Sequence, residues 1–149
     1  MAQRWVLLAY RLPREPSTPR IAVWRRLRRL GVAQVLDGLV ALPHDRRTRE
    51  QLEWVAGEVE EAGGEATLWI AEPSTAAQHR ALAERMTAAV GADYRSVVEA
   101  ARAARDGRAL GRLRRTLQQI RARDFFESPE RRRAERAIER LAERVEALR

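Results

Sequence analysis

The sequence predicts an α+β protein in which a domain of strands and helices precedes an all-helical extension. Apolar runs typical of strands cover residues 4–12, 32–42 and 65–71. The two segments between these runs carry apolar residues at helical spacing. The rest of the chain shows helical spacing alone. These patterns predict an α+β domain over residues 1–73 and a helical extension packed on it over residues 74–149.

The first strand and the first helix have clear boundaries in the sequence. Residues 4–12 form an uninterrupted apolar run that Pro13 ends, which is typical of a central strand buried on both faces. Ser17 or Thr18 is placed to cap the following helix. Gly31 is expected to end that helix. Four apolar residues share one face of it and are expected to be buried: Val23, Trp24, Leu27 and Leu30.

The next elements complete a β-α-β-β-α-β order. The Asp37-Gly38 pair is a strong turn signal, compatible with a tight hairpin or with a bulge inside one strand. A second helix is expected over residues 48–62, ending at the Gly63-Gly64 pair before the third strand. This order predicts a ferredoxin-like sheet with both helices on one face. The basic first helix would then lie beside the acidic second helix.

Four helices are expected in the extension. The first starts after Ser74-Thr75 and ends at Gly91, and the second ends near Asp106-Gly107. The last two are separated by the Asp124-Phe125-Phe126 segment and are expected to form an antiparallel hairpin. The two phenylalanines are expected to fill the corner of that hairpin, with Asp124 capping a helix or pairing with a neighbouring arginine.

Positive charge is concentrated in two segments, residues 1–43 and residues 107–123. All 29 basic residues are arginines, against 21 acidic residues, for a net charge of +8. Such concentrations favour a site for a polyanion or a small oxyanion, although solvated helix faces would give the same pattern. Arginine suits either anion because its guanidinium binds two oxygens at once. The candidate binding residues are Arg20, Arg25, Arg26, Arg28, Arg29, Arg108, Arg112 and Arg115.

Several classes of function are not expected. Cysteine is absent, so disulfides and thiol chemistry are excluded. His44 and His79 lack metal-ligand spacing, and no nucleophile or acid–base pair is recognisable. We therefore expect neither an enzyme nor a metal or cofactor site. No apolar run is long enough to span a membrane, and no signal peptide is recognisable, which favours a cytoplasmic protein.

Three segments carry a resemblance to a known family: WVLLAYRLPREPSTPRIAVWRRLRRLG, VLDGLVALP and RARDFFESPERRRAERAIERL. They resemble the N-terminal domain of the chromate-resistance protein ChrB. A more distant similarity links the chain to the central domain of the PaaX repressor. The order of elements also resembles CRISPR-associated ferredoxin-like endonucleases, but Arg11 stands where those enzymes carry a metal-binding aspartate.

The ChrB resemblance implies a chromate-responsive regulator of transcription, which usually carries a second, C-terminal domain. We therefore expect a DNA-binding or oxyanion-responsive protein acting through its arginine-rich helices, with DNA, chromate or another oxyanion as partner. Because the chain has no cysteine, a chromate response would be reversible anion binding. The alternative is a non-enzymatic interaction module, a homodimer whose arginines pair with glutamates or solvate helices.

Overall fold

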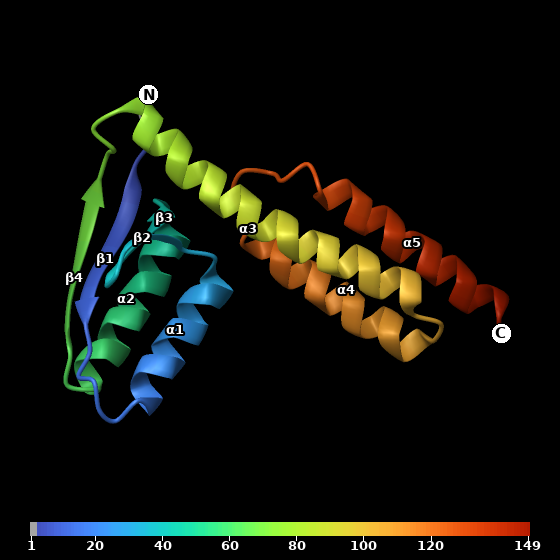
Figure 1. Ribbon diagram of the computed structural model, residues 1–149, viewed down its shortest axis with the longest axis horizontal. Coiled ribbons are helices and arrows are strands. Elements are labelled where there is room, and N and C mark those ends of the chain that lie inside the picture. Colours follow the sequence, from blue (N-terminus) through green and yellow to red (C-terminus); the bar gives the residue numbers. More distant parts are fainter. Residues whose placement is uncertain (1–2) are drawn as a thin grey trace. The chain divides into compact units, whose positions relative to one another are not determined.

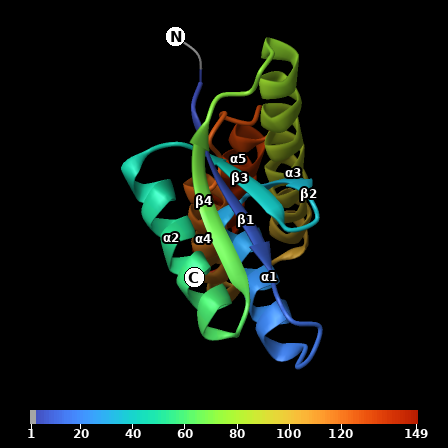
Figure 2. The same cartoon turned by 90° about the vertical axis from the view of Figure 1, so that its left-hand side faces the viewer.

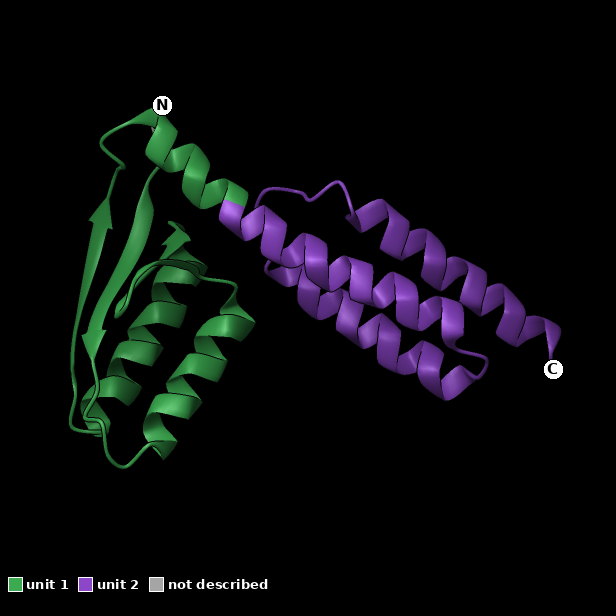
Figure 3. Ribbon diagram, viewed as in Figure 1, with its two compact units in different colours: residues 1–84 green, residues 85–149 purple. Residues whose placement is uncertain are grey.

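The computed structural model describes residues 3–149 and divides into two compact units, one ending at Glu84 and one spanning residues 85–149 (Figure 3). The chain is α+β, as predicted (Figure 1). Helix α3 (Ala76–Ala103) begins in unit 1 and ends in unit 2. The other elements of unit 1 are β1 (Trp5–Arg11), α1 (Thr18–Leu30), β2 (Ala33–Leu36), β3 (Leu39–Pro43), α2 (Arg46–Glu61) and β4 (Glu65–Ala71).

The sheet of unit 1 is antiparallel, with the strand order β2-β3-β1-β4. Helices α1 and α2 lie side by side on one face of it (Figures 1 and 2). Val6 and Leu8 of β1 are almost fully buried, whereas Leu7 and Ala9 on the opposite face stay partly accessible. The expectation that β1 is buried on both faces is thus wrong for its middle, because the two helices cover one face.

A tight hairpin connects β2 and β3, which resolves the alternatives at Asp37-Gly38. Gly38 takes a φ of 73°, a conformation that glycine adopts without strain. Its carbonyl oxygen accepts a hydrogen bond of 2.8 Å from the Tyr10 backbone N–H. A Cβ at Gly38 would lie 2.5 Å from the Tyr10 carbonyl oxygen, so glycine also permits the close approach of this turn to β1.

Helix α1 ends as predicted, but its buried face is narrower than predicted. Gly31 is the left-handed C-cap, with a φ of 80°. Val23 and Leu27 are buried, whereas Trp24 is 53% exposed. Trp24 follows Val23 by about 100° around the helix. It therefore lies at the edge of the apolar stripe and beyond the reach of the sheet.

Helix α2 begins with a capping box that the sequence analysis did not identify. The Asp45 side chain accepts a hydrogen bond of 2.8 Å from the Thr48 backbone N–H, and the Thr48 hydroxyl accepts one of 3.0 Å from the Asp45 N–H. The same hydroxyl donates to the Pro43 carbonyl oxygen at 2.7 Å, so the buried threonine is fully bonded. This contact ties the start of α2 to the end of β3.

Helix α3 is continuous, so the predicted helix end at Gly91 is wrong. Gly91 is buried in unit 2, and a Cβ there would lie 3.6 Å from both the Ser128 hydroxyl and the Glu130 side chain. These are ordinary van der Waals distances, so the backbone at Gly91 continues as helix inside the core of the unit. The predicted boundary between two helices of the extension therefore does not exist.

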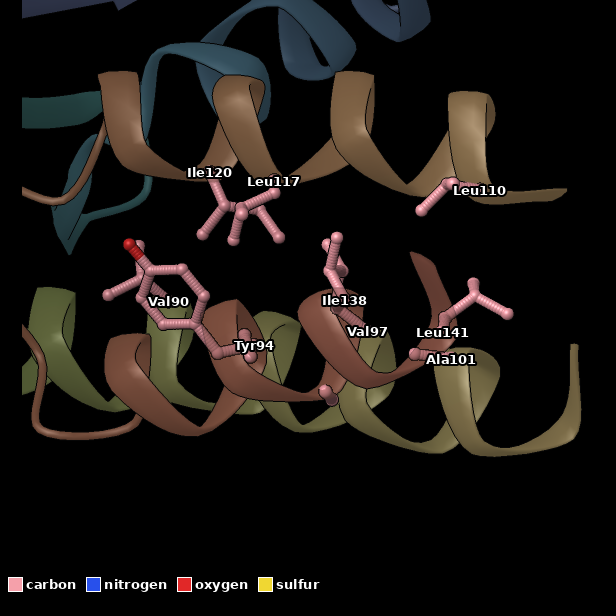
Figure 4. Packing of buried hydrophobic residues seen from close by; sticks show 11 residues of the cluster. Val90, Tyr94, Val97, Ala101, Leu110, Leu117, Ile120, Ile138 and Leu141 are labelled. Atoms are coloured by element: carbon pink, nitrogen blue, oxygen red, sulfur yellow. The ribbon is translucent and has the colours of Figure 1, made fainter. Parts of the chain in front are cut away.

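Unit 2 is built from the second part of α3 with α4 (Gly107–Ala122) and α5 (Arg131–Ala147). Helices α4 and α5 run antiparallel, as predicted (Figure 1). The apolar residues in the first part of α5 are buried in this unit, whereas Leu148 at its end is 73% exposed. The cluster in Figure 4 comprises Val90, Tyr94, Val97, Ala101, Leu110, Leu117, Ile120, Ala134, Ala137, Ile138 and Leu141.

Asp124 holds the corner between α4 and α5. It accepts hydrogen bonds from the Tyr94 hydroxyl at 2.8 Å and from the Ser128 backbone N–H at 3.0 Å. The expected pairing of Asp124 with a neighbouring arginine is replaced by these contacts, and Arg123 instead pairs with Asp93 at 2.9 Å. Both phenylalanines of the corner are only half-buried and lie outside the core cluster.

Two glycines of unit 1 are expected to respond oppositely to alanine. Gly57→Ala should stabilise the protein by about 0.5–1 kcal/mol, because the site is an exposed helix interior with open space for a methyl group. Gly64→Ala should destabilise it by at least about 1 kcal/mol, because the new Cβ would collide with the Arg11 carbonyl oxygen and Val59. Urea denaturation followed by circular dichroism measures both, and equal shifts would contradict the packing at Gly64.

Removal of the Tyr94 hydroxyl is expected to weaken unit 2. Tyr94→Phe keeps the buried ring but leaves the Asp124 carboxylate without its buried donor. We expect a loss of about 1–3 kcal/mol in the free energy of unfolding. Denaturation of the variant beside the wild type tests this, and an unchanged midpoint would show that water replaces the bond at no cost.

Candidate anion-binding groove

Unit 1 carries an open groove of about 960 Å³. The end of β1, the loop that follows it, the first turns of α1 and the β2–β3 hairpin form its walls. The groove is lined by Tyr10, Arg11, Leu12, Arg14, Ser17, Arg20, Ile21, Trp24, Gln34, Asp37 and Gly38.

Local sequence features bring these walls together. Pro13 prevents β1 from continuing and turns the chain towards α1. Ser17 precedes α1 but makes no side-chain capping bond within the described residues, so its hydroxyl lies free at the groove wall. The hydrogen bond between Tyr10 and Gly38 holds the hairpin against the end of β1. The groove therefore forms because the β1–α1 connection and the β2–β3 hairpin are short and hold these elements close together.

Positive charge dominates the groove. Arg11, Arg14 and Arg20 line it, against the single carboxylate of Asp37. Arg11 also pairs with Glu65 at 3.2 Å. Because both side chains of that pair are 79% exposed, solvent screens it and Arg11 can exchange partners. The local charge balance suits an anion.

Tyr10 lines the groove, and its pKa depends on burial and on two charged neighbours. Its burial raises the pKa of the phenol, the Asp37 carboxylate raises it further, and Arg20 acts in the opposite direction. Tyr10 therefore remains a neutral hydroxyl at physiological pH and is available as a hydrogen-bond donor. Both charged residues lie within electrostatic reach of that hydroxyl.

Trp24 forms an apolar section of the groove wall. Its indole is half exposed, and the Arg28 guanidinium lies 5.0 Å from the ring centroid in a cation–π contact. Arg28 is not one of the groove-lining residues. The tryptophan is thus supported by an arginine outside the groove while part of its surface remains accessible within it.

The candidate arginines predicted from the sequence occupy different environments. Arg20 lines the groove, and Arg28 contacts Trp24. Arg26 forms an ion pair with Glu58 of α2, so its charge is largely neutralised by a neighbouring helix. Arg25 and Arg29 are exposed on α1. The remaining three lie exposed on α4 in unit 2: Arg108, Arg112 and Arg115.

Of the residues that line the groove, only Arg20 is among the binding residues expected from the sequence. Arg11 and Arg14 lie on a strand end and a loop, where no periodicity indicates which way a side chain faces. Tyr10 and Trp24 belong to apolar patterns, which predict burial and not a place on a groove wall. The available signal was the arginine-bearing loop RLPREPS between β1 and α1.

Among residues 3–149 there is no cluster of three or more histidine, aspartate or glutamate residues that could hold a metal ion. His79 accepts a hydrogen bond of 3.2 Å from the Trp5 indole N–H and contacts its ring edge-on, which indicates a packing role. None of the helices in the described range has the length and apolarity needed to cross a membrane.

These features define an α+β protein whose first unit carries an arginine-lined groove. A profile of the family described as "Protein ChrB, N-terminal" matches residues 20–106, which is more than half of the chain. The chain therefore belongs to the family of the ChrB N-terminal domain, the chromate-resistance family indicated by the sequence resemblance.

A curated relative supports this membership. Protein ChrB of Cupriavidus metallidurans is 32% identical over 88 residues, which cover 56% of this chain and 26% of the relative. The match thus spans about a quarter of that protein's length. No solved structure matches the chain significantly.

Substitutions of the two charged neighbours should move the Tyr10 pKa in opposite directions. Asp37→Asn should lower it towards its ordinary value, because a negative charge beside the phenol is removed. Asparagine before glycine keeps the hairpin turn. Arg20→Ala should raise the pKa. A titration monitored by NMR of carbon-13-labelled tyrosine measures both, and shifts of the same sign would contradict this geometry.

Proposed function

We propose that this protein is a regulatory module of a chromate-resistance system that binds DNA through exposed arginines of α1. Membership of the ChrB N-terminal family supports the physiological context. The cytoplasmic location expected of a transcription regulator belongs to the same proposal. The β-α-β-β-α-β order of unit 1 supports a ferredoxin-like relationship for that unit.

The observation that carries this proposal is the solvent face of α1. Arg25 and Arg29 are four residues apart and therefore lie on the same side of the helix. Both are exposed, and neither forms an ion pair with any residue in the range 3–149. The helix sequence contains no acidic residue. Such a face attracts the phosphates of a duplex without regard to sequence.

A second basic face on α4 of unit 2 supports the same function. Arg108, Arg112 and Arg115 are exposed, and residues 107–123 contain six arginines and no acid. Phosphate contacts from this face would add to affinity and to its salt dependence.

The alternative is a non-enzymatic interaction module that forms a homodimer. Edge strand β4 favours it, because Trp69 is 60% exposed and the neighbouring Ile70 is 43% exposed. The ion pair between Arg26 and Glu58 also fits a structural role for one of the α1 arginines. A monomer in sedimentation velocity at micromolar concentration would argue against this alternative.

Duplex binding should depend on the α1 arginines. The double variant Arg25→Glu/Arg29→Glu should lose at least about tenfold in affinity at 100 mM salt, because two phosphate contacts become repulsive. For the wild type, raising the salt from 25 to 250 mM should weaken binding by orders of magnitude if several phosphates are contacted. Fluorescence anisotropy with a labelled duplex measures both effects.

A matched control variant distinguishes the effect of the α1 face on duplex binding from the effect of net charge. Arg132→Glu/Arg136→Glu changes the total charge equally, at exposed positions of α5. We expect it to weaken binding much less than the α1 variant. Equal losses in the two variants, or a flat response to salt, would overturn the proposal.

A further inference from the structure

We propose that the groove of unit 1 binds a nucleoside phosphate, with the phosphate on its arginines and the base against Trp24. The nucleotide unit is either free or part of an unpaired strand, since both present the same chemistry. This site is separate from the Arg25 and Arg29 face of α1 and does not depend on duplex binding.

The size of the groove favours a ligand larger than a simple oxyanion. A volume of about 960 Å³ lies in the range of sites that hold small organic molecules. A tetrahedral oxyanion occupies a few water volumes of roughly 30 Å³ each, so it would fill a small part of this space. Arg11, Arg14 and Arg20 come from β1, the following loop and α1, and so surround the space from separate elements.

The polar groups beside the arginines discriminate further between ligands. Asp37 brings a carboxylate that repels a bare anion and accepts hydrogen bonds. Ribose hydroxyls or the amino group of a base would supply the donors that this carboxylate needs. The Gln34 amide already donates to the Leu36 carbonyl oxygen at 2.6 Å, whereas the neutral Tyr10 hydroxyl can both donate and accept. A ligand with an anionic part and a neutral polar part satisfies this set, whereas phosphate or chromate alone does not.

Trp24 supplies the surface for a base. Large apolar side chains exposed on a groove wall frequently contact ligands, and every base can stack on an indole. The Arg28 guanidinium, 5.0 Å from the ring centroid, holds the indole in place from outside the groove. Half of the Trp24 surface remains accessible although the helix has a buried face nearby.

Isothermal titration calorimetry of the full chain tests the site with four probes: ADP, adenosine, inorganic phosphate and a single-stranded octamer of deoxyadenosine. We expect ADP to bind with 1:1 stoichiometry and at least tenfold more tightly than phosphate or adenosine. A larger affinity for the octamer than for ADP would identify the strand as the source of the nucleotide. An affinity for ADP equal to or above that of the octamer would identify the free nucleotide.

Matched variants separate the groove from general charge and exposed aromatic surface. Trp24→Ala should weaken ADP at least tenfold, whereas Trp54→Ala, at a tryptophan that is 65% exposed on α2, should not. Arg14→Ala should weaken ADP at least tenfold, whereas Arg132→Ala should not. Far-ultraviolet circular dichroism confirms that each variant is folded.

Three results would overturn the inference. They are the absence of ADP binding at millimolar concentration, phosphate affinity equal to that of ADP, and equal losses in Trp24→Ala and Trp54→Ala. The two proposals are tested separately. The Arg25→Glu/Arg29→Glu variant should lose its affinity for duplex DNA and keep its affinity for ADP. Loss of ADP binding in that variant would also contradict two separate sites.

Discussion

Unit 1 depends on the central position of β1 in its sheet. The strand pairs with β3 on one side and β4 on the other, and Val6 and Leu8 fill the space beneath α1 and α2. Its register fixes where Tyr10 meets the Gly38 turn. Because the groove lies at this junction, its geometry is set by backbone hydrogen bonds. Side chains there can vary in chemistry without disturbing the frame that holds them.

Much of the fold was predictable because it rests on local signals. Gly31 ends α1, and Asp37-Gly38 forms a turn, since each requires a backbone conformation that few residues adopt. The Gly91 prediction failed because local signals do not reveal tertiary packing. A glycine between two apolar stretches suggests a helix end, yet Gly91 lies inside α3 and is buried among the helices of unit 2.

The candidate site was predictable only in part. Charge counts identified α1 as basic, but they could not show that Glu58 on another helix neutralises Arg26. Helical spacing placed Trp24 on the apolar stripe. Because Trp24 directly follows the buried Val23, it lies at the edge of that stripe and is exposed. The groove joins a strand end, a loop, a helix start and a hairpin. A single sequence gives no measure of such distances between elements.

The ion pair between Arg26 and Glu58 has a consequence for how a charged partner approaches. On the side of α1 next to α2, Glu58 offsets the charge of Arg26, while Arg25 and Arg29 stay exposed to solvent. At physiological ionic strength the Debye length is about 8 Å, so an incoming polyanion senses mainly the nearest face. The pairing of a basic helix with an acidic one thereby makes the attraction directional, and an encounter complex would form in a preferred orientation.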